Sequence, residues 1–244
     1  MRRFVVILGF LAFTSSFQVV PSAVRGVSSR YTQTSTSLDA AVESGDKVLI
    51  IGGTGGVGQL VTKKLRKLSD VDVRVTARNS EEARETIGDE EVEICEVDLL
   101  ADKANALAAA LEGVSAVLIS VGTTAFPTMR WRGGNTPDAI DNVAVARIAK
   151  LASNVSGMKR IVLLTSIGVD RTDEMPFVIL NLFGVLDAKR NGENAVKEQA
   201  QAAGIEYAIV RPGRLVGGPY TNIDFVKLLE IEGGTYGGGA LRCC

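Results

Sequence analysis

The sequence has 244 residues, a hydrophobic fraction of 46%, a charged fraction of 23% and a net charge of −1, values typical of one globular domain with extensions. It contains no histidine, which excludes Ser-His-Asp and Cys-His hydrolysis, histidine-based zinc sites and proton transfer by imidazole. The near-neutral charge provides no basic field for nucleic acid, and Cys95, Cys243 and Cys244 match neither a disulfide framework nor a metal site.

The N-terminus has the layout of a targeting segment. Two arginines precede an apolar run from Phe4 to Phe13, and small residues follow, so residues 1–16 are predicted to be a signal peptide. Residues 17–45 open with a stretch rich in Ser and Thr that contains two arginines and no acidic residue, which predicts a transit peptide or linker. With Phe17 at the junction, the two parts resemble the plastid presequences of algae with secondary plastids. The alternative to plastid delivery is secretion with a flexible linker.

From residue 46 to residue 232, apolar runs alternate with segments of helical periodicity, and no membrane-spanning run is present. Strands are predicted at Lys47 to Ile51, Val71 to Ala77, Val92 to Leu99, Ala116 to Val121, Arg160 to Thr165 and Tyr207 to Arg211. Helices are predicted at Gln59 to Leu68, Glu81 to Thr86, Asp102 to Leu111, Asp138 to Ser153 and Lys189 to Ala203, with a loop from Gly122 to Pro137. This alternation predicts a single α/β domain, a doubly wound parallel sheet of the Rossmann type. Residues 233–244 are predicted to be a glycine-rich tail.

The first predicted strand ends in a glycine-rich turn, Gly52-Gly53-Thr54-Gly55-Gly56-Val57-Gly58. Glycines let the backbone turn sharply and approach a pyrophosphate closely. The helix that follows presents free N–H groups and its positive dipole end to the phosphates. Because the turn follows a strand and opens a helix, it predicts a dinucleotide site.

Two residues at the ends of the next strands bear on the choice of dinucleotide. Arg78 ends the second strand, where NAD-preferring sites usually have an acidic residue for the ribose 2′-hydroxyl, and an arginine there accommodates a 2′-phosphate. The sequence therefore favours NADP(H) over NAD(H). Asp98 ends the third strand and is expected either to accept a hydrogen bond from the adenine amino group or to cap a helix that begins at Ala101.

Several of these features resemble a known family: the turn at 52–58, Arg78, Asp98, Thr165-Ser166 and Arg211-Pro212-Gly213. They are similar to the atypical short-chain dehydrogenase/reductases. Within that family, residues 122–137, 181–186 and 211–221 resemble plant chloroplast NAD(P)-binding proteins of the NmrA-like, NAD(P)H-binding group, and the likeness covers residues 47–229. The family pattern continues with a further strand and helices, so the C-terminal part is expected to be truncated.

The resemblance also indicates which catalytic groups to expect. Catalytically competent members of the family use a Tyr-x-x-x-Lys pair and a serine to move the proton that accompanies hydride transfer. Lys189 and Ser166 occupy the lysine and serine positions. The tyrosine position is Val185, so the usual proton donor is missing. Lys189 is expected to bind the nicotinamide ribose or to be a helix-surface lysine, and Ser166 to serve the substrate or to cap a turn. Glu193 is expected to pair with Lys189 at i,i+4.

The resemblance and the motifs together predict a set of contacts to the cofactor: Gly52, Gly53, Thr54, Gly55, Gly56, Val57, Gly58, Arg78, Asp98, Leu99, Gly122, Lys189 and Pro212. Two functions follow. One is an NADP(H)-dependent oxidoreductase acting on a small plastid metabolite with an unusual proton source. The other is a non-catalytic, cofactor-sensing assembly or regulatory factor. The partner beyond the dinucleotide is an unidentified small-molecule substrate or protein.

Overall fold

The computed structural model describes residues 44–68, 70–101, 104–213, 215–216 and 241–242. Residues 1–43 of the two predicted targeting segments lie outside this part, and so does the predicted glycine-rich tail apart from residues 241–242.

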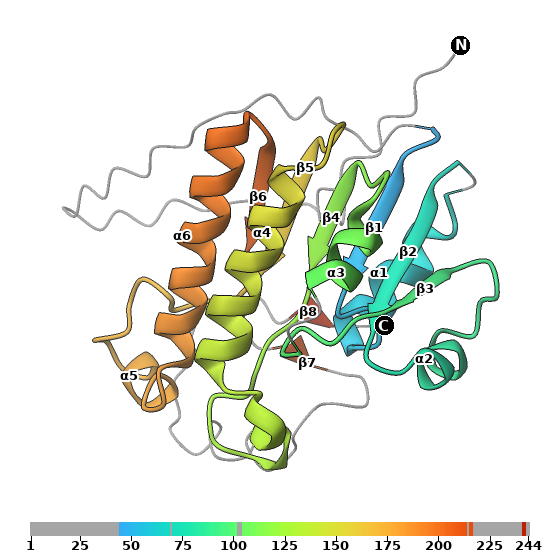
Figure 1. The fold of residues 1–244 in the computed structure, drawn as a ribbon. Helices are drawn as coiled ribbons and strands as arrows, with labels where there is room; N and C mark the ends of the chain where they lie inside the picture. The colour runs from blue at the N-terminus through green and yellow to red at the C-terminus, as the bar shows by residue number, and fades with distance from the viewer. Residues whose placement is uncertain (1–43, 69, 102–103, 214, 217–240, 243–244) are drawn as a thin grey trace, which may run out of the picture.

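Six parallel strands form one sheet in the order β3-β2-β1-β4-β5-β6 (Figure 1). They are β1 (Lys47–Ile51), β2 (Asp72–Ala77), β3 (Glu93–Glu96), β4 (Ala116–Ile119), β5 (Arg160–Leu164) and β6 (Glu206–Val210). This is the strand order of a Rossmann fold, so the predicted fold class is confirmed. A separate parallel pair joins β7 (Leu215–Val216) to β8 (Leu241–Arg242).

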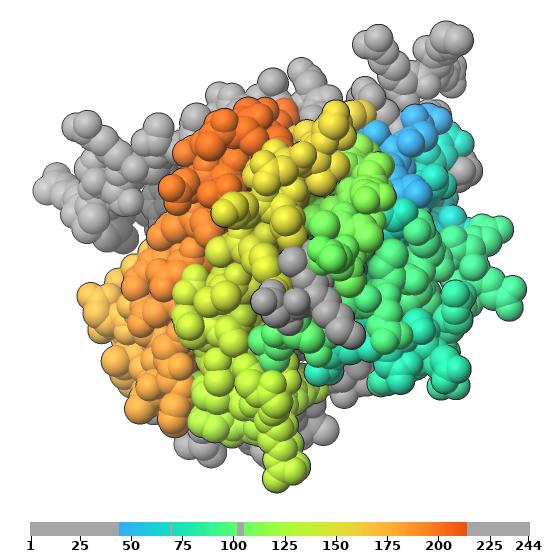
Figure 2. Space-filling view, viewed as in Figure 1, coloured from blue at the N-terminus to red at the C-terminus, as the bar shows by residue number. Residues whose placement is uncertain are grey.

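Helices cover both faces of the sheet (Figure 1). One face carries α1 (Gly56–Leu65) and α2 (Ser80–Ile87), and the other carries α3 (Ala104–Leu111), α4 (Val145–Ser153) and α6 (Val185–Ala203). The π-helix η2 (Asp138–Ala144) leads directly into α4. Figure 2 shows α4 and α6 in contact along their length.

The alternation of side chains along β1 explains the two layers. Leu49 and Ile51 are buried in one hydrophobic cluster with residues of α3, α4 and α6, whereas Val48 and Ile50 are buried in a second cluster with residues of α1 and α2. Complete burial of such a side chain stabilises the fold by about 1.5–3 kcal/mol. A strand that is apolar on both faces must lie in the centre of a covered sheet.

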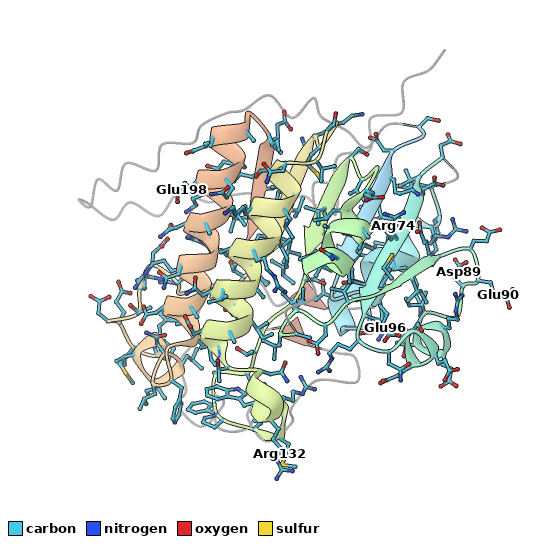
Figure 3. All side chains as sticks on the ribbon, viewed as in Figure 1. Arg74, Asp89, Glu90, Glu96, Arg132 and Glu198 are labelled. Atoms are coloured by element: carbon cyan, nitrogen blue, oxygen red, sulfur yellow. The ribbon has the colours of Figure 1, made fainter. Side chains whose placement is uncertain are left out.

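The buried Arg74 on β2 is explained by the fold alone (Figure 3). Its Nη1 donates to the carbonyls of Ala110 and Glu112 at the end of α3, at 2.7 and 3.0 Å, and its Nη2 pairs with Glu93 at 2.8 Å. A cation at the C-terminus of a helix is favoured by the helix dipole. Nearby, burial raises the pKa of the Cys95 thiol, in keeping with its predicted role as a small apolar residue of a strand.

Besides shifts of a few residues at other element ends and the short pair β7-β8, three segments differ from the prediction. The stretch from Gly122 to Pro137 is not entirely a loop, because it contains the 3-10 helix η1 (Met129–Gly134), and a short helix α5 (Phe177–Leu180) was not predicted. The last helix begins at Val185, one turn before Lys189. Its start is fixed by Asn181, whose Oδ1 accepts hydrogen bonds from the backbone N–H groups of residues 186 and 187 at 2.9 and 3.1 Å.

The strand order determines where a ligand can bind. The chain runs outward from β1 to β3 and then returns to place β4 beside β1. The connections that leave the carboxyl ends of β1 and β4 therefore diverge to opposite faces of the sheet, and in this class of fold the crevice between them binds the ligand. Figure 3 shows η1 at this edge, with Arg132 at its outer tip.

Candidate dinucleotide site

The turn after β1 requires glycine at three positions. Gly52 has a φ of +86°, and a Cβ there would lie 3.0 Å from the backbone of Ser120 on the β4 side. A Cβ on Gly53 would lie 2.2 Å from Cγ1 of Val75, and a Cβ on Gly58 would lie 2.2 Å from the carbonyl oxygen of Gly52. The two 2.2 Å distances are too short for non-bonded atoms, and the positive φ of Gly52 is one that other residues rarely adopt, so the turn is a closely packed structure and not a flexible linker.

Helix α1 begins within this glycine turn. Its N-cap is Gly55, which provides no side-chain cap, and the first turn of the helix contains no acidic residue. The backbone N–H groups of Gly56, Val57 and Gly58 have no partner within the helix. Gln59 Nε2 donates to the carbonyl of Thr54 at 2.8 Å, which fixes the turn from the helix side. An uncapped helix start of this kind accepts an anion such as a pyrophosphate.

Arg78 lies beside the turn and is exposed. Ile51 pairs with Thr76 across β1 and β2, so Arg78, two residues further on, is next to the start of the glycine turn. Among the described residues, none forms an ion pair or hydrogen bond with Arg78. Its guanidinium therefore remains available to a ligand group at this rim.

Asp98 and Leu99 form the loop after β3. Asp98 is exposed, and its Oδ1 accepts a hydrogen bond from the backbone N–H of Leu100 at 2.9 Å. Asp98 thereby closes a local turn, and because residues 102–103 lie outside the described part, its role as a cap of the following helix stays a prediction. The carbonyl of Leu99 accepts from Arg147 Nη2 at 2.5 Å, so a side chain of α4 holds this loop.

A buried ion pair lies behind the end of β4. Lys189 Nζ is 2.5 Å from Asp141 Oδ1, and the two side chains are only 12% and 2% exposed. Asp141 Oδ2 accepts hydrogen bonds from the backbone N–H of Thr123, at 3.1 Å, and from its hydroxyl. A Cβ on Gly122 would lie 3.0 Å from Lys189 Nζ. Lys189 is therefore not the helix-surface lysine that one alternative predicted.

Val185 cannot be exchanged simply for the missing tyrosine. It is 3% exposed and packs in a cluster with Val169, Phe177 and Leu186. Its side chain thus faces the apolar interior beneath α5, although it precedes Lys189 by four residues. The helical spacing alone did not reveal this orientation.

Ser166 and Pro212 lie on adjoining strand ends. The Ser166 hydroxyl donates to the carbonyl of Ile167 at 3.2 Å, and both of its predicted roles, toward a substrate or as a turn cap, stay predictions. The backbone N–H of Ile167 donates to the carbonyl of the buried Pro212 at 2.9 Å. This hydrogen bond joins the loops that follow β5 and β6.

The prediction that Glu193 pairs with Lys189 is wrong. Glu193 is completely buried, and its Oε1 accepts from Thr165 Oγ1 at 2.7 Å and from Arg211 Nε at 2.8 Å. Hydrogen bonding to Glu193, and then to Asp170, raises the pKa of the Arg211 guanidinium above its ordinary value. The carboxylate thus joins α6 to the ends of β5 and β6, and this long-range contact replaces the expected i,i+4 pair.

Apart from Ser166 and Pro212, which follow β5 and β6, the predicted residues divide into three groups. The glycine turn and Arg78 lie at the ends of β1 and β2, Asp98 and Leu99 follow β3, and Gly122 meets Lys189 beyond β4. Sequence reasoning missed Asp141, Thr123 and Ser120. A signal for Asp141 was present, because an acidic residue interrupts a helical stripe that includes Ile140, Ala144 and Ile148.

These features define a class of protein. A parallel sheet of this strand order, with a glycine turn and an uncapped helix at its switch point, is a Rossmann dinucleotide-binding domain. The chain belongs to the NAD(P)H-binding family, whose sequence profile matches residues 52–237. Its ligand class is therefore a nicotinamide dinucleotide. In the described residues, no helix has the length and apolar composition to cross a bilayer, and no group of His, Cys, Asp and Glu side chains could hold a metal ion.

Proteins of similar sequence or structure support this family assignment. "Protein TIC 62, chloroplastic" of Pisum sativum is 32% identical over 250 residues, covering 85% of this chain and 45% of that protein. An uncharacterised chloroplastic protein of Arabidopsis thaliana is 29% identical over 210 residues, covering 80% of this chain and 60% of that protein. This chain thus spans about half the length of these relatives. A solved putative NAD-dependent epimerase/dehydratase from Bacillus halodurans is 25% identical, with a TM-score of 0.56 over 72% of this chain and 74% of that one.

Proposed function

We propose that this protein binds NADP(H) in preference to NAD(H) at the carboxyl edge of its sheet. The observation that carries the proposal is the free guanidinium of Arg78 beside the uncapped N-terminus of α1. A 2′-phosphate carries two negative charges at neutral pH, and an arginine binds it with charge-assisted hydrogen bonds. A site for NAD(H) would instead have a carboxylate at this strand end to accept the ribose hydroxyl.

The residues present fit such a cofactor. The three crowded glycines leave the backbone N–H groups of the turn open to a pyrophosphate, with no Cβ in the way. At the other end, Gly122 leaves space next to the Lys189 ammonium, which has three N–H donors. Asp141 occupies one of these donors, and the others are directed to ribose hydroxyls in this proposal.

Arg78→Asp is expected to reverse the preference. In the unsubstituted protein, NADPH should raise the melting temperature more than NADH does, because binding to the native state alone stabilises it by about 2.7 kcal/mol at a hundredfold excess over Kd. In the variant, NADH should stabilise more. The measurement is thermal unfolding with each cofactor, and the control is Arg84→Asp, an exposed arginine of α2. Equal stabilisation by both cofactors in the unsubstituted protein would contradict the role of Arg78.

The reaction at this site is a separate question with two candidates. An oxidoreductase acting on a small plastid metabolite would need a proton source other than residue 185, because Val185 is apolar and buried. That observation favours the second candidate, a cofactor-sensing assembly or regulatory factor that binds NADP(H) without conventional carbonyl reduction. The sensing candidate is the one we propose.

We further propose that the protein acts in a plastid. Its relatives from Pisum sativum and Arabidopsis thaliana are described as chloroplastic, and residues 1–45 have the composition of a two-part presequence. Residues 1–45 fused to a fluorescent reporter are expected to deliver it to the plastid of an alga with secondary plastids. Phe17→Ala should leave the same reporter in the secretory route. Secretion of the unsubstituted fusion would support the alternative of a signal peptide with a linker.

A further inference from the structure

The buried pair of Asp141 and Lys189 results from an unusual local packing of two helices. A Cβ on Gly192 would lie 2.2 Å from the carbonyl oxygen of Asp141, so only glycine lets α6 approach η2 this closely. Lys189 lies one turn before Gly192 on α6, and Asp141 lies in the middle of the widened π-turn. π-helical turns are rare and are often found at functional sites. This packing places a lysine from one helix directly against a carboxylate from the other.

Both oxygens of the Asp141 carboxylate have partners, and each partner belongs to the dinucleotide edge. Oδ1 accepts from Lys189 Nζ, and Oδ2 accepts from the backbone and hydroxyl of Thr123, the second residue of the loop that begins at Gly122. A single carboxylate therefore holds the lysine of α6 and the loop after β4 in one arrangement.

Stability alone does not account for this pair. Removing two charges from water costs several kcal/mol per ion, and buried ion pairs are often no more stabilising than apolar side chains of similar volume. The pair lies next to Gly122, where a side chain would be 3.0 Å from Lys189 Nζ and 3.2 Å from Asp141 Oδ1. The ammonium thus borders Gly122, where the absence of a side chain leaves the N–H groups of Lys189 uncovered on that side.

We propose that Asp141 is a positioning residue for the dinucleotide. It holds the Lys189 ammonium against Gly122 and balances its charge, so that the remaining N–H donors face the ribose hydroxyls. Where no tyrosine stands near the lysine, the carboxylate provides its anionic partner. This inference rests on the proposed function, because it assigns a role within the same NADP(H) site.

A double-mutant cycle tests the positioning role of Asp141. NADPH affinity is measured by the fluorescence of the bound cofactor for the unsubstituted protein, Asp141→Asn, Lys189→Met and the double variant. The expected result is that Asp141→Asn raises Kd about tenfold, as for the loss of a charge-assisted hydrogen bond, and that it has no further effect once Lys189 is methionine. The control is Asp138→Asn, which removes an exposed carboxylate of the same π-helix and should leave Kd unchanged.

A second measurement needs no cofactor. In the unliganded protein, Lys189 should react with acetic anhydride several-fold faster in Asp141→Asn than in the unsubstituted protein, as read by peptide mass spectrometry. Lys197, which pairs with Glu193 and is 36% exposed, should react equally in both. If Asp141→Asn does not fold, as judged by circular dichroism, Asp141→Glu replaces it in both measurements, because it keeps the charge and moves the carboxylate by one methylene.

The outcomes separate the two proposals. No NADPH binding by the unsubstituted protein would overturn the proposed function. Binding that is insensitive to Asp141→Asn, or an equal loss of affinity with lysine or methionine at position 189, would overturn the role of Asp141 while leaving the cofactor proposal intact.

Discussion

Gly58→Ala is expected to abolish detectable NADPH binding and to lower the free energy of unfolding by about 1–3 kcal/mol. The added Cβ would lie 2.2 Å from the carbonyl oxygen of Gly52 and 2.7 Å from Cα of Gly53, and both are backbone atoms that cannot rotate away. The start of α1 must then move off the turn, and overpacking of this kind costs about 1–3 kcal/mol. Urea unfolding and NADPH titration measure the two effects.

The matched control is Gly213→Ala. A Cβ at Gly213 meets no atom of the described residues within 4 Å, so the unfolding free energy of this variant should be unchanged. If Gly58→Ala kept the stability and the NADPH affinity of the unsubstituted protein, the turn would not be the closely packed phosphate site described above.

The second large expected effect concerns the rate at which the protein reduces carbonyl substrates. The unsubstituted protein is expected to reduce small carbonyl substrates with NADPH roughly 10²- to 10⁴-fold more slowly than a reductase that keeps the tyrosine, since that is the usual contribution of a positioned general acid. Val185→Tyr should not restore the rate. Residue 185 is 3% exposed among Val169, Phe177 and Leu186, so the larger ring should cost about 1–3 kcal/mol of stability instead.

Oxidation of NADPH and thermal unfolding measure these two expectations. The control is Val178→Tyr, which adds the same ring at a residue of α5 that is 43% exposed and should leave the stability unchanged. Rapid carbonyl reduction by the unsubstituted protein, with a pH profile that reports a group titrating near neutrality, would show that another residue donates the proton.

Much of the fold could be predicted from local patterns of apolar residues in the sequence. The apolar run from Lys47 to Ile51 and the periodic segments between the strands predicted the sheet and five of its helices, because burial on both faces leaves a strong signal in the sequence. The 3-10 helix η1 and α5 were missed, since elements of one or two turns are too short for a periodic pattern. The start of α6 was placed late because its N-cap is Gly184, and the side chain that accepts from its first N–H groups, Asn181, lies four residues before the helix.

Less of the candidate site than of the fold could be predicted from the sequence. The places of the glycine turn and Arg78 at the ends of β1 and β2 could be predicted because they depend on position relative to a single strand each, whereas the role of Arg78 stays a proposal. Asp141 and the long-range contacts of Glu193 could not be assigned, since these partners come from other elements: Lys189 lies 48 residues beyond Asp141, and Arg211 lies 18 residues beyond Glu193. The local i,i+4 rule paired Glu193 with Lys189 on its N-terminal side, whereas its i,i+4 partner is Lys197 on its C-terminal side.

The strand order has a consequence for how the chain folds. β1, β2 and β3 are joined by short crossovers, whereas β1 meets its other neighbour, β4, only after the chain has completed β2, β3 and α3. Non-local pairing of this kind is slow, because loop closure must come before the contacts form. During synthesis, the edge of β1 that pairs with β4 remains unpaired until β4 has left the ribosome. Because the proposed dinucleotide site lies across β1 and β4, a bound dinucleotide would stabilise only the sheet in which these two strands have paired.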